Sequence, residues 1–123
     1  MRIMIADDNP QMRKFLRTYF EMPDVLIFEC SNGLEAVEQY ETILPDYVLM
    51  DIDMPVMWGI DAARRILSSF PNASIIMISF SIELKWIEEA MKFGVKRCFS
   101  KENLALLKIY IDENIFKKES INL

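Results

Sequence analysis

The chain has 123 residues, of which 52% are apolar and 27% are charged, and its formal net charge is -5. This length fits one domain with one buried core, and the composition excludes disordered, collagen-like and low-complexity proteins. The negative charge argues against duplex DNA as a direct partner, because phosphate binding normally needs a basic surface.

Missing residue types exclude several kinds of site. The chain has no histidine and only two cysteines, which excludes Cys/His zinc sites, Ser-His-Asp and Cys-His catalysis, and a disulfide scaffold. The apolar start, Met1 to Ala6, stops at Asp7 and is too short for a signal peptide or a membrane span. We therefore expect a cytoplasmic protein without membrane contact, whose chemistry uses carboxylates, hydroxyls, lysines or a metal.

Short apolar runs alternate with segments whose apolar residues recur at helical spacing. In chain order the predicted elements are strand 2–6, a helix that starts near 10 and includes 15–20, strand 25–30, a helix after 32 to about 42, strand 47–50, helix 59–70, strand 74–78, helix 82–93, strand 95–100 and helix 103–117. Asp8 or Asn9 is expected to cap the first helix, Asn32 the second and Ser81 the fourth. Gly94 is expected to end the fourth helix.

This alternation predicts one α/β domain over residues 1–123. Strands of continuous apolar residues are typical of a parallel sheet covered on both faces. We expect a doubly wound (βα)5 flavodoxin-like sandwich, with a five-stranded parallel sheet in the order 2-1-3-4-5.

In such sheets, ligands bind beyond the carboxyl ends of the strands. The polar residues that follow the first, third, fourth and fifth strands are Asp7 and Asp8, Asp51 and Asp53, Ser79, and Lys101. Clustered carboxylates suit Mg²⁺, which takes oxygen ligands and keeps several waters. A carboxylate can also act as a nucleophile toward a phosphoryl group, with a cation and a lysine offsetting the charge that is transferred.

The segments IMIADDNP, VLMDIDMPVMWG, IIMISFS and RCFSK, in this order, resemble the receiver domain of bacterial response regulators. The resemblance extends from residue 2 to about 117 and is closest to receivers that usually precede a helix-turn-helix domain. It implies that Asp51 accepts the phosphoryl group and, with Asp8, binds Mg²⁺ directly. It also implies that Asp7 acts through water, that the Asp53 carbonyl completes the metal shell, and that Ser79 and Lys101 bind the phosphoryl oxygens.

The resemblance also implies the partners. The donor is expected to be the phosphohistidine of a sensor histidine kinase or phosphotransfer protein, or a small acyl phosphate, and the chain is expected to catalyse nothing beyond its own phosphorylation and dephosphorylation. Output, to another protein or to a second copy, is expected through the face made by the fourth helix, fifth strand and fifth helix. The residues assigned to output coupling are Phe80, Ile87, Cys98, Leu106, Ile109 and Tyr110. No output domain is expected, which leaves open a stand-alone regulator or the excised receiver of a DNA-binding one.

Three residues depart from the family pattern. Phe80 stands where a small residue follows the switch hydroxyl, and it is expected to narrow access to the site. Cys98 replaces the switch aromatic residue, so the usual coupled movement of hydroxyl and ring is not available. Glu102 replaces the proline that commonly follows the lysine, here Lys101. An acidic residue at this position fits the receivers that usually precede a helix-turn-helix domain.

Two alternatives remain open from the sequence. Phe80 and Cys98 favour a degenerate receiver that binds partners without phosphorylation. Asp51-Ile52-Asp53 is also an Asp-x-Asp motif, as in haloacid dehalogenase-like phosphatases, although that family carries the motif on its first strand.

Trp58 and Trp86 are expected to be partly buried aromatic residues, and Trp58 lies close enough to Asp51 in sequence to report on the site.

Overall fold

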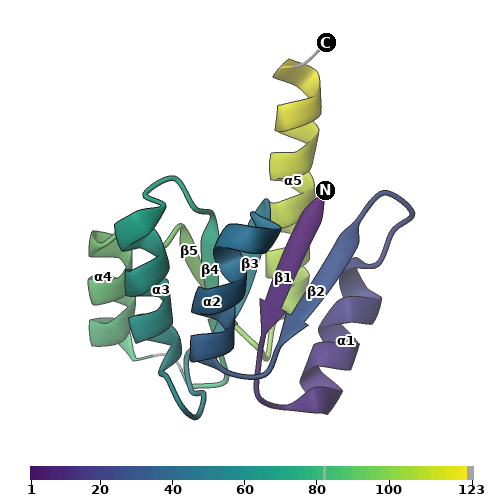
Figure 1. Cartoon of the computed structure of the whole chain (residues 1–123). Coiled ribbons are helices and arrows are strands. Elements are labelled where there is room, and N and C mark those ends of the chain that lie inside the picture. The colour runs from purple at the N-terminus through teal and green to yellow at the C-terminus, as the bar shows by residue number, and fades with distance from the viewer. Residues whose placement is uncertain (82, 122–123) are drawn as a thin grey trace.

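The structure, a computed structural model, describes residues 1–81 and 83–121, and in the last helix it describes side chains up to Asn114. Strands and helices alternate along the chain as predicted (Figure 1). The elements are β1 (Arg2–Ala6), α1 (Pro10–Phe20), β2 (Leu26–Cys30), α2 (Gly33–Ile43), β3 (Tyr47–Asp51), α3 (Gly59–Ser69), β4 (Ile75–Ser79), α4 (Leu84–Lys92), β5 (Arg97–Ser100) and α5 (Leu104–Ile121). Among the described residues, no helix is long and apolar enough to cross a membrane.

The five strands form one parallel sheet in the order β2-β1-β3-β4-β5. This confirms the predicted fold class and strand order. The register pairs Ala6 with Met50 and Asp51 with Ile78, so the carboxyl ends of the central strands reach the same edge of the sheet.

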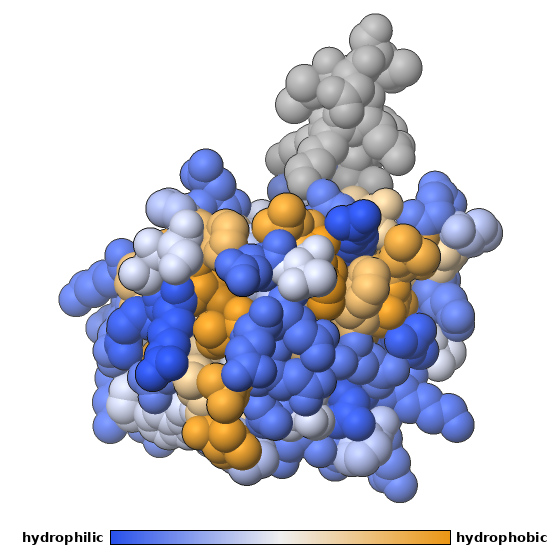
Figure 2. Space-filling model, viewed as in Figure 1, coloured by the Kyte–Doolittle hydropathy of each residue, from blue (hydrophilic) through white to orange (hydrophobic). Residues whose placement is uncertain are grey.

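Both faces of the sheet are covered by helices, as the apolar strands predict. Alternate residues of a strand point to opposite faces, so Met4 and Val48 join the core beneath α2, α3 and α4, whereas Ile5 and Leu49 join the core beneath α1 and α5. The outward faces of the helices in front of the sheet carry mainly hydrophilic side chains (Figure 2).

Helix caps agree with the sequence at two helices and differ at one. The Asn9 side chain accepts hydrogen bonds from the N–H groups of Gln11 and Met12, and Asn32 accepts one from Glu35. The prediction that Ser81 caps α4 is wrong, because α4 begins at Leu84 with Glu83 at its N-cap and no side-chain cap. The Ser81 N–H instead donates to Ser79 Oγ, which draws this loop toward the end of β4.

Candidate functional site

Three carboxylates meet at the carboxyl edge of the sheet. Asp7 and Asp8 directly follow β1, and Asp51 is the last residue of the neighbouring strand β3. One ligand oxygen from each of the three lies within 4.8 Å of the others. Asp7 and Asp51 are 0% and 4% exposed, whereas Asp8 is open to solvent. The topology therefore assembles the acidic cluster that the sequence predicts.

Lys101 brings a cation into this cluster from the end of β5. Its Nζ lies 2.7 Å from Asp7 Oδ2 and 3.3 Å from Asp51 Oδ1, and its side chain is 6% exposed. Its backbone N–H donates to the Ser79 carbonyl over 2.9 Å, which ties the β5–α5 loop to the end of β4. Water screens such a buried ion pair only weakly, so Lys101 is a strong local charge at the two acids.

Asp7 is held rigidly and keeps one oxygen available. Its Oδ1 accepts a hydrogen bond of 2.9 Å from the Asn9 N–H, and its carbonyl accepts one of 2.7 Å from Arg13 Nη1. Asp7 Oδ2 is buried and faces the Lys101 ammonium at 2.7 Å, which leaves one of its two lone pairs for a further partner. A buried carboxylate oxygen with spare acceptor capacity beside two further carboxylates fits a hard cation such as Mg²⁺.

Burial has the largest effect on the pKa of the Asp51 carboxyl. It raises the pKa of the Asp51 carboxyl from 3.8 to about 6, because the charged form loses its hydration. The Lys101 ammonium lowers this pKa, the Asp7 carboxylate raises it, and a hydrogen bond from the Asp53 backbone lowers it. Asp51 is thus a desolvated carboxylate, and the Lys101 ammonium does not fully offset the cost of burying its charge.

Ser79 and Asp53 flank this carboxylate. Ser79 is 2% exposed at the end of β4, next to β3, and its Oγ donates to the Ser81 carbonyl over 3.3 Å. Asp53 is exposed in the loop after β3. The structure thus brings the predicted site residues to one edge, with Ser79 bonded to its own loop.

The loop between β3 and α3 is drawn tightly against the end of β3. The Gly59 N–H donates to the Ile52 carbonyl over 2.9 Å, and a Cβ on Gly59 would lie 1.9 Å from the Asp51 carbonyl oxygen. Only glycine fits this approach. Val56 in the same loop has φ 68, a left-handed conformation that is costly for a β-branched residue.

Phe80 lies beside the site, directly after β4. Its ring is 60% exposed, and the Lys101 ammonium lies 5.4 Å from its centroid, within cation–π range. The position of Phe80 beside the site follows from the sequence, but its contact with Lys101 does not. Arg13, which bonds the Asp7 carbonyl, also carries no sequence signal.

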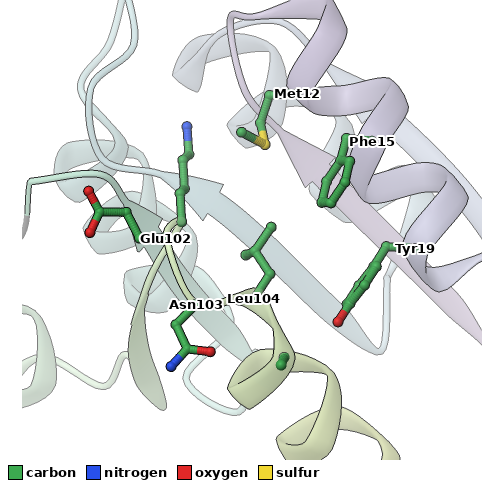
Figure 3. A pocket seen from close by; sticks show the side chains of 8 residues that line it. Met12, Phe15, Tyr19, Glu102, Asn103 and Leu104 are labelled. Carbon is green, nitrogen blue, oxygen red and sulfur yellow. The ribbon is translucent and has the colours of Figure 1, made fainter.

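A groove of ≈ 390 Å³ adjoins the site between α1 and the start of α5. Met12, Phe15 and Tyr19 line it from α1. Leu104 points toward them, whereas Glu102 and Asn103 point away (Figure 3). Lys101 is part of its lining, whereas Asp7, Asp8 and Asp51 are not.

Residues 3–111 match the family model of the response regulator receiver domain. The chain belongs to the response regulator receiver family. The receiver is 42% identical over 96 residues to the chemotaxis protein CheY of Thermotoga maritima, an alignment that covers 77% of this chain and 80% of CheY. It is 38% identical over 98 residues to the transcriptional regulatory protein YhcZ of Bacillus subtilis, which covers 78% of this chain but only 46% of YhcZ.

The fold agrees with solved receivers. CheY in the crystal structure of the CheX-CheY-BeF3-Mg²⁺ complex of Borrelia burgdorferi superposes with a TM-score of 0.81 and 28% identity, covering 89% of this chain and 86% of that one. Two-component signalling by receivers involves kinases, phosphotransfer proteins and output partners. The match places the chain with receivers and argues against the phosphatase alternative, whose motif lies on a first strand, whereas Asp51 ends β3.

Proposed function

We propose that this receiver accepts a phosphoryl group on Asp51 and uses the modified site to change its protein contacts. The observation that carries the proposal is the buried Asp51 carboxylate with Lys101 Nζ at 3.3 Å and Asp7 beside it. A carboxylate oxygen of Asp51 attacks the phosphorus of a phosphohistidine or a small acyl phosphate. The bond from phosphorus to the donor breaks, the donor leaves with that electron pair, and Asp51 becomes an acyl phosphate.

Mg²⁺ is proposed as the cofactor of this step. The residues that would hold it are Asp8 and Asp51 directly, Asp7 through water and the Asp53 carbonyl. Bound there, Mg²⁺ would neutralise charge on the phosphoryl oxygens. This chain's own contributions are Lys101, which holds one phosphoryl oxygen, and Ser79, whose hydroxyl must leave the Ser81 carbonyl to bind another. The chain would catalyse only its own phosphorylation and dephosphorylation.

Output is proposed through the face made by α4, β5 and α5. Leu106 and Ile109 are 52% and 53% exposed there, beside a hollow of ≈ 200 Å³. The Arg97 guanidinium lies 5.2 Å from the Phe99 ring and 5.1 Å from the Tyr110 ring. Apolar side chains with a cation over aromatic rings suit a protein partner, either another protein or a second copy.

Cys98 and Ile87 lie on the α4 side of this face. Cys98 packs against the core beneath α2, α3 and α4, and burial raises the pKa of its thiol. Ile87 is half-buried on α4. With Cys98 in place of a ring, no aromatic side chain at that position of β5 can follow the movement of Ser79.

Beryllofluoride, an analogue of the bound phosphoryl group, tests the proposal. With Mg²⁺ it is expected to raise the melting temperature of wild type and not that of Asp51→Asn, which lacks the carboxylate oxygen that bonds beryllium. Failure to bind would favour the second candidate, a partner-binding module independent of phosphorylation. That candidate is supported by Phe80 over Lys101 beside the site.

A further inference from the structure

Two tryptophans join the loop after Asp51 to helix α4. The ring centroids of Trp58 and Trp86 lie 5.0 Å apart with an interplanar angle of 83°, an edge-to-face contact. Trp58 ends the β3–α3 loop, which begins after Asp51, and Trp86 stands in the first turn of α4. α3 and α4 lie side by side (Figure 1). The contact thus bridges the phosphorylation edge and one element of the proposed output face.

Trp58 stands at a helix position that usually carries a capping side chain. It is the N-cap of α3, and no side chain there accepts a hydrogen bond from the helix. Ser, Thr, Asp and Asn are strongly preferred at N-caps because their oxygens satisfy the free N–H groups of the first turn. A tryptophan forgoes that stabilisation, and its ring, 38% exposed, is directed to Trp86 instead of the core.

Trp86 also packs, partly buried, against the core beneath α2, α3 and α4. The Lys85 ammonium lies 4.9 Å from the centroid of its ring. Helix α4 itself, described over its whole length, is weakly anchored, since Ala90 is its one buried residue, whereas α3 buries six. Helices with few buried contacts are the ones that shift most readily. Arg64 of α3 forms an ion pair with Glu89 of α4, and the Trp58–Trp86 contact joins α4 to the end of the loop that follows Asp51.

We propose that the Trp58–Trp86 contact couples occupancy of the Asp51 site to the position of α4, in the role that a ring at Cys98 would otherwise serve. The inference rests on the proposed function, because it needs a phosphoryl group or its analogue at Asp51. Such coupling requires that the contact differ in strength between the free and the occupied Asp51 site. Coupling between two sites is reciprocal, so weakening the contact must change the affinity at Asp51.

The first measurement uses the two rings as their own reporter. Indoles this close couple their electronic transitions and give paired bands in far-ultraviolet circular dichroism. Trp58→Phe and Trp86→Phe are each expected to abolish this signal in the free protein, which assigns it to the pair. Saturating beryllofluoride and Mg²⁺ are expected to change it in wild type.

The second measurement is beryllofluoride affinity by titration calorimetry with Mg²⁺ present. Trp86→Leu is expected to change the affinity for beryllofluoride by about two- to tenfold, the range that an aromatic pair contributes. The matched control is Phe70→Leu, which removes the Phe70 ring from Tyr40, 4.9 Å away, at the other end of α3. The control is expected to leave the affinity unchanged, which separates coupling from a general loss of aromatic packing.

The two possible failures are distinguishable. If wild type binds no beryllofluoride, the proposed function is refuted and this inference with it. If wild type binds beryllofluoride but its paired bands do not change, and Trp86→Leu binds as wild type does, only the coupling is overturned. The wild-type spectrum decides this even if Trp86→Leu does not fold.

Discussion

Replacing Asp51 with asparagine should stabilise the receiver when no metal ion is present. In the folded chain the pKa of Asp51 is raised from 3.8 to about 6, chiefly by burial. The folded state therefore holds a proton that the unfolded state has lost across this window, and stability falls as pH rises through it. A shift of this size corresponds to about 3 kcal/mol at pH 8, and the Asp51→Asn variant escapes this cost because its amide carries no charge.

The assay is urea unfolding in EDTA at several pH values. Asp51→Asn is expected to be more stable than wild type by about 2 to 3 kcal/mol at pH 8, with the difference fading toward pH 4. Glu41→Gln, which removes an exposed carboxylate from α2, serves as the control and should change little at any pH. A variant less stable than wild type at pH 8, or an advantage that does not depend on pH, would refute the reasoning about desolvation.

Three further predictions concern the metal and the backbone. Millimolar Mg²⁺ should raise the melting temperature of wild type at pH 8 and much less at pH 5, where Asp51 is protonated; equal shifts at both values would contradict the carboxylate site. Val56→Gly should stabilise the fold by about 1 kcal/mol in urea unfolding, because it relieves a positive φ at an exposed residue; no gain would argue against strain there. Asn9→Ala should cost about 1 kcal/mol through loss of the α1 cap, whereas Asn9→Asp should cost much less.

Most of the fold can be predicted from the sequence because the three central strands, β1, β3 and β4, are mainly apolar runs. The predicted bounds of β1 match the structure to the residue. β3 extends one residue further, through Asp51, and β4 is shifted by one residue, beginning at Ile75 and ending at Ser79. Because Asp51 and Ser79 are polar, the apolar pattern predicts that both lie in loops. In the structure they end their strands, where they contribute to the site. The start of α4 also differs from the prediction. Ser81 has a residue type that often caps helices, but its backbone N–H donates a hydrogen bond to Ser79 Oγ.

The site can be predicted as a set of residues but not as a set of contacts. That Asp7, Asp51 and Lys101 meet follows from strand order, which sequence pattern and family resemblance both supply. That Lys101 lies nearer to Asp7 than to Asp51, and that Phe80 lies over it, depends on side-chain packing. The Trp58–Trp86 contact joins residues 28 positions apart, and no local pattern signals it.

Phosphorylation of Asp51 is the central claim, and intact-mass spectrometry tests it most directly. The receiver is incubated with Mg²⁺ and a small acyl phosphate, in parallel with Asp51→Asn, and each mass is recorded before the adduct can hydrolyse. The account predicts one phosphoryl adduct on wild type and none on the variant. No adduct on wild type, or an equal adduct on Asp51→Asn, would contradict it.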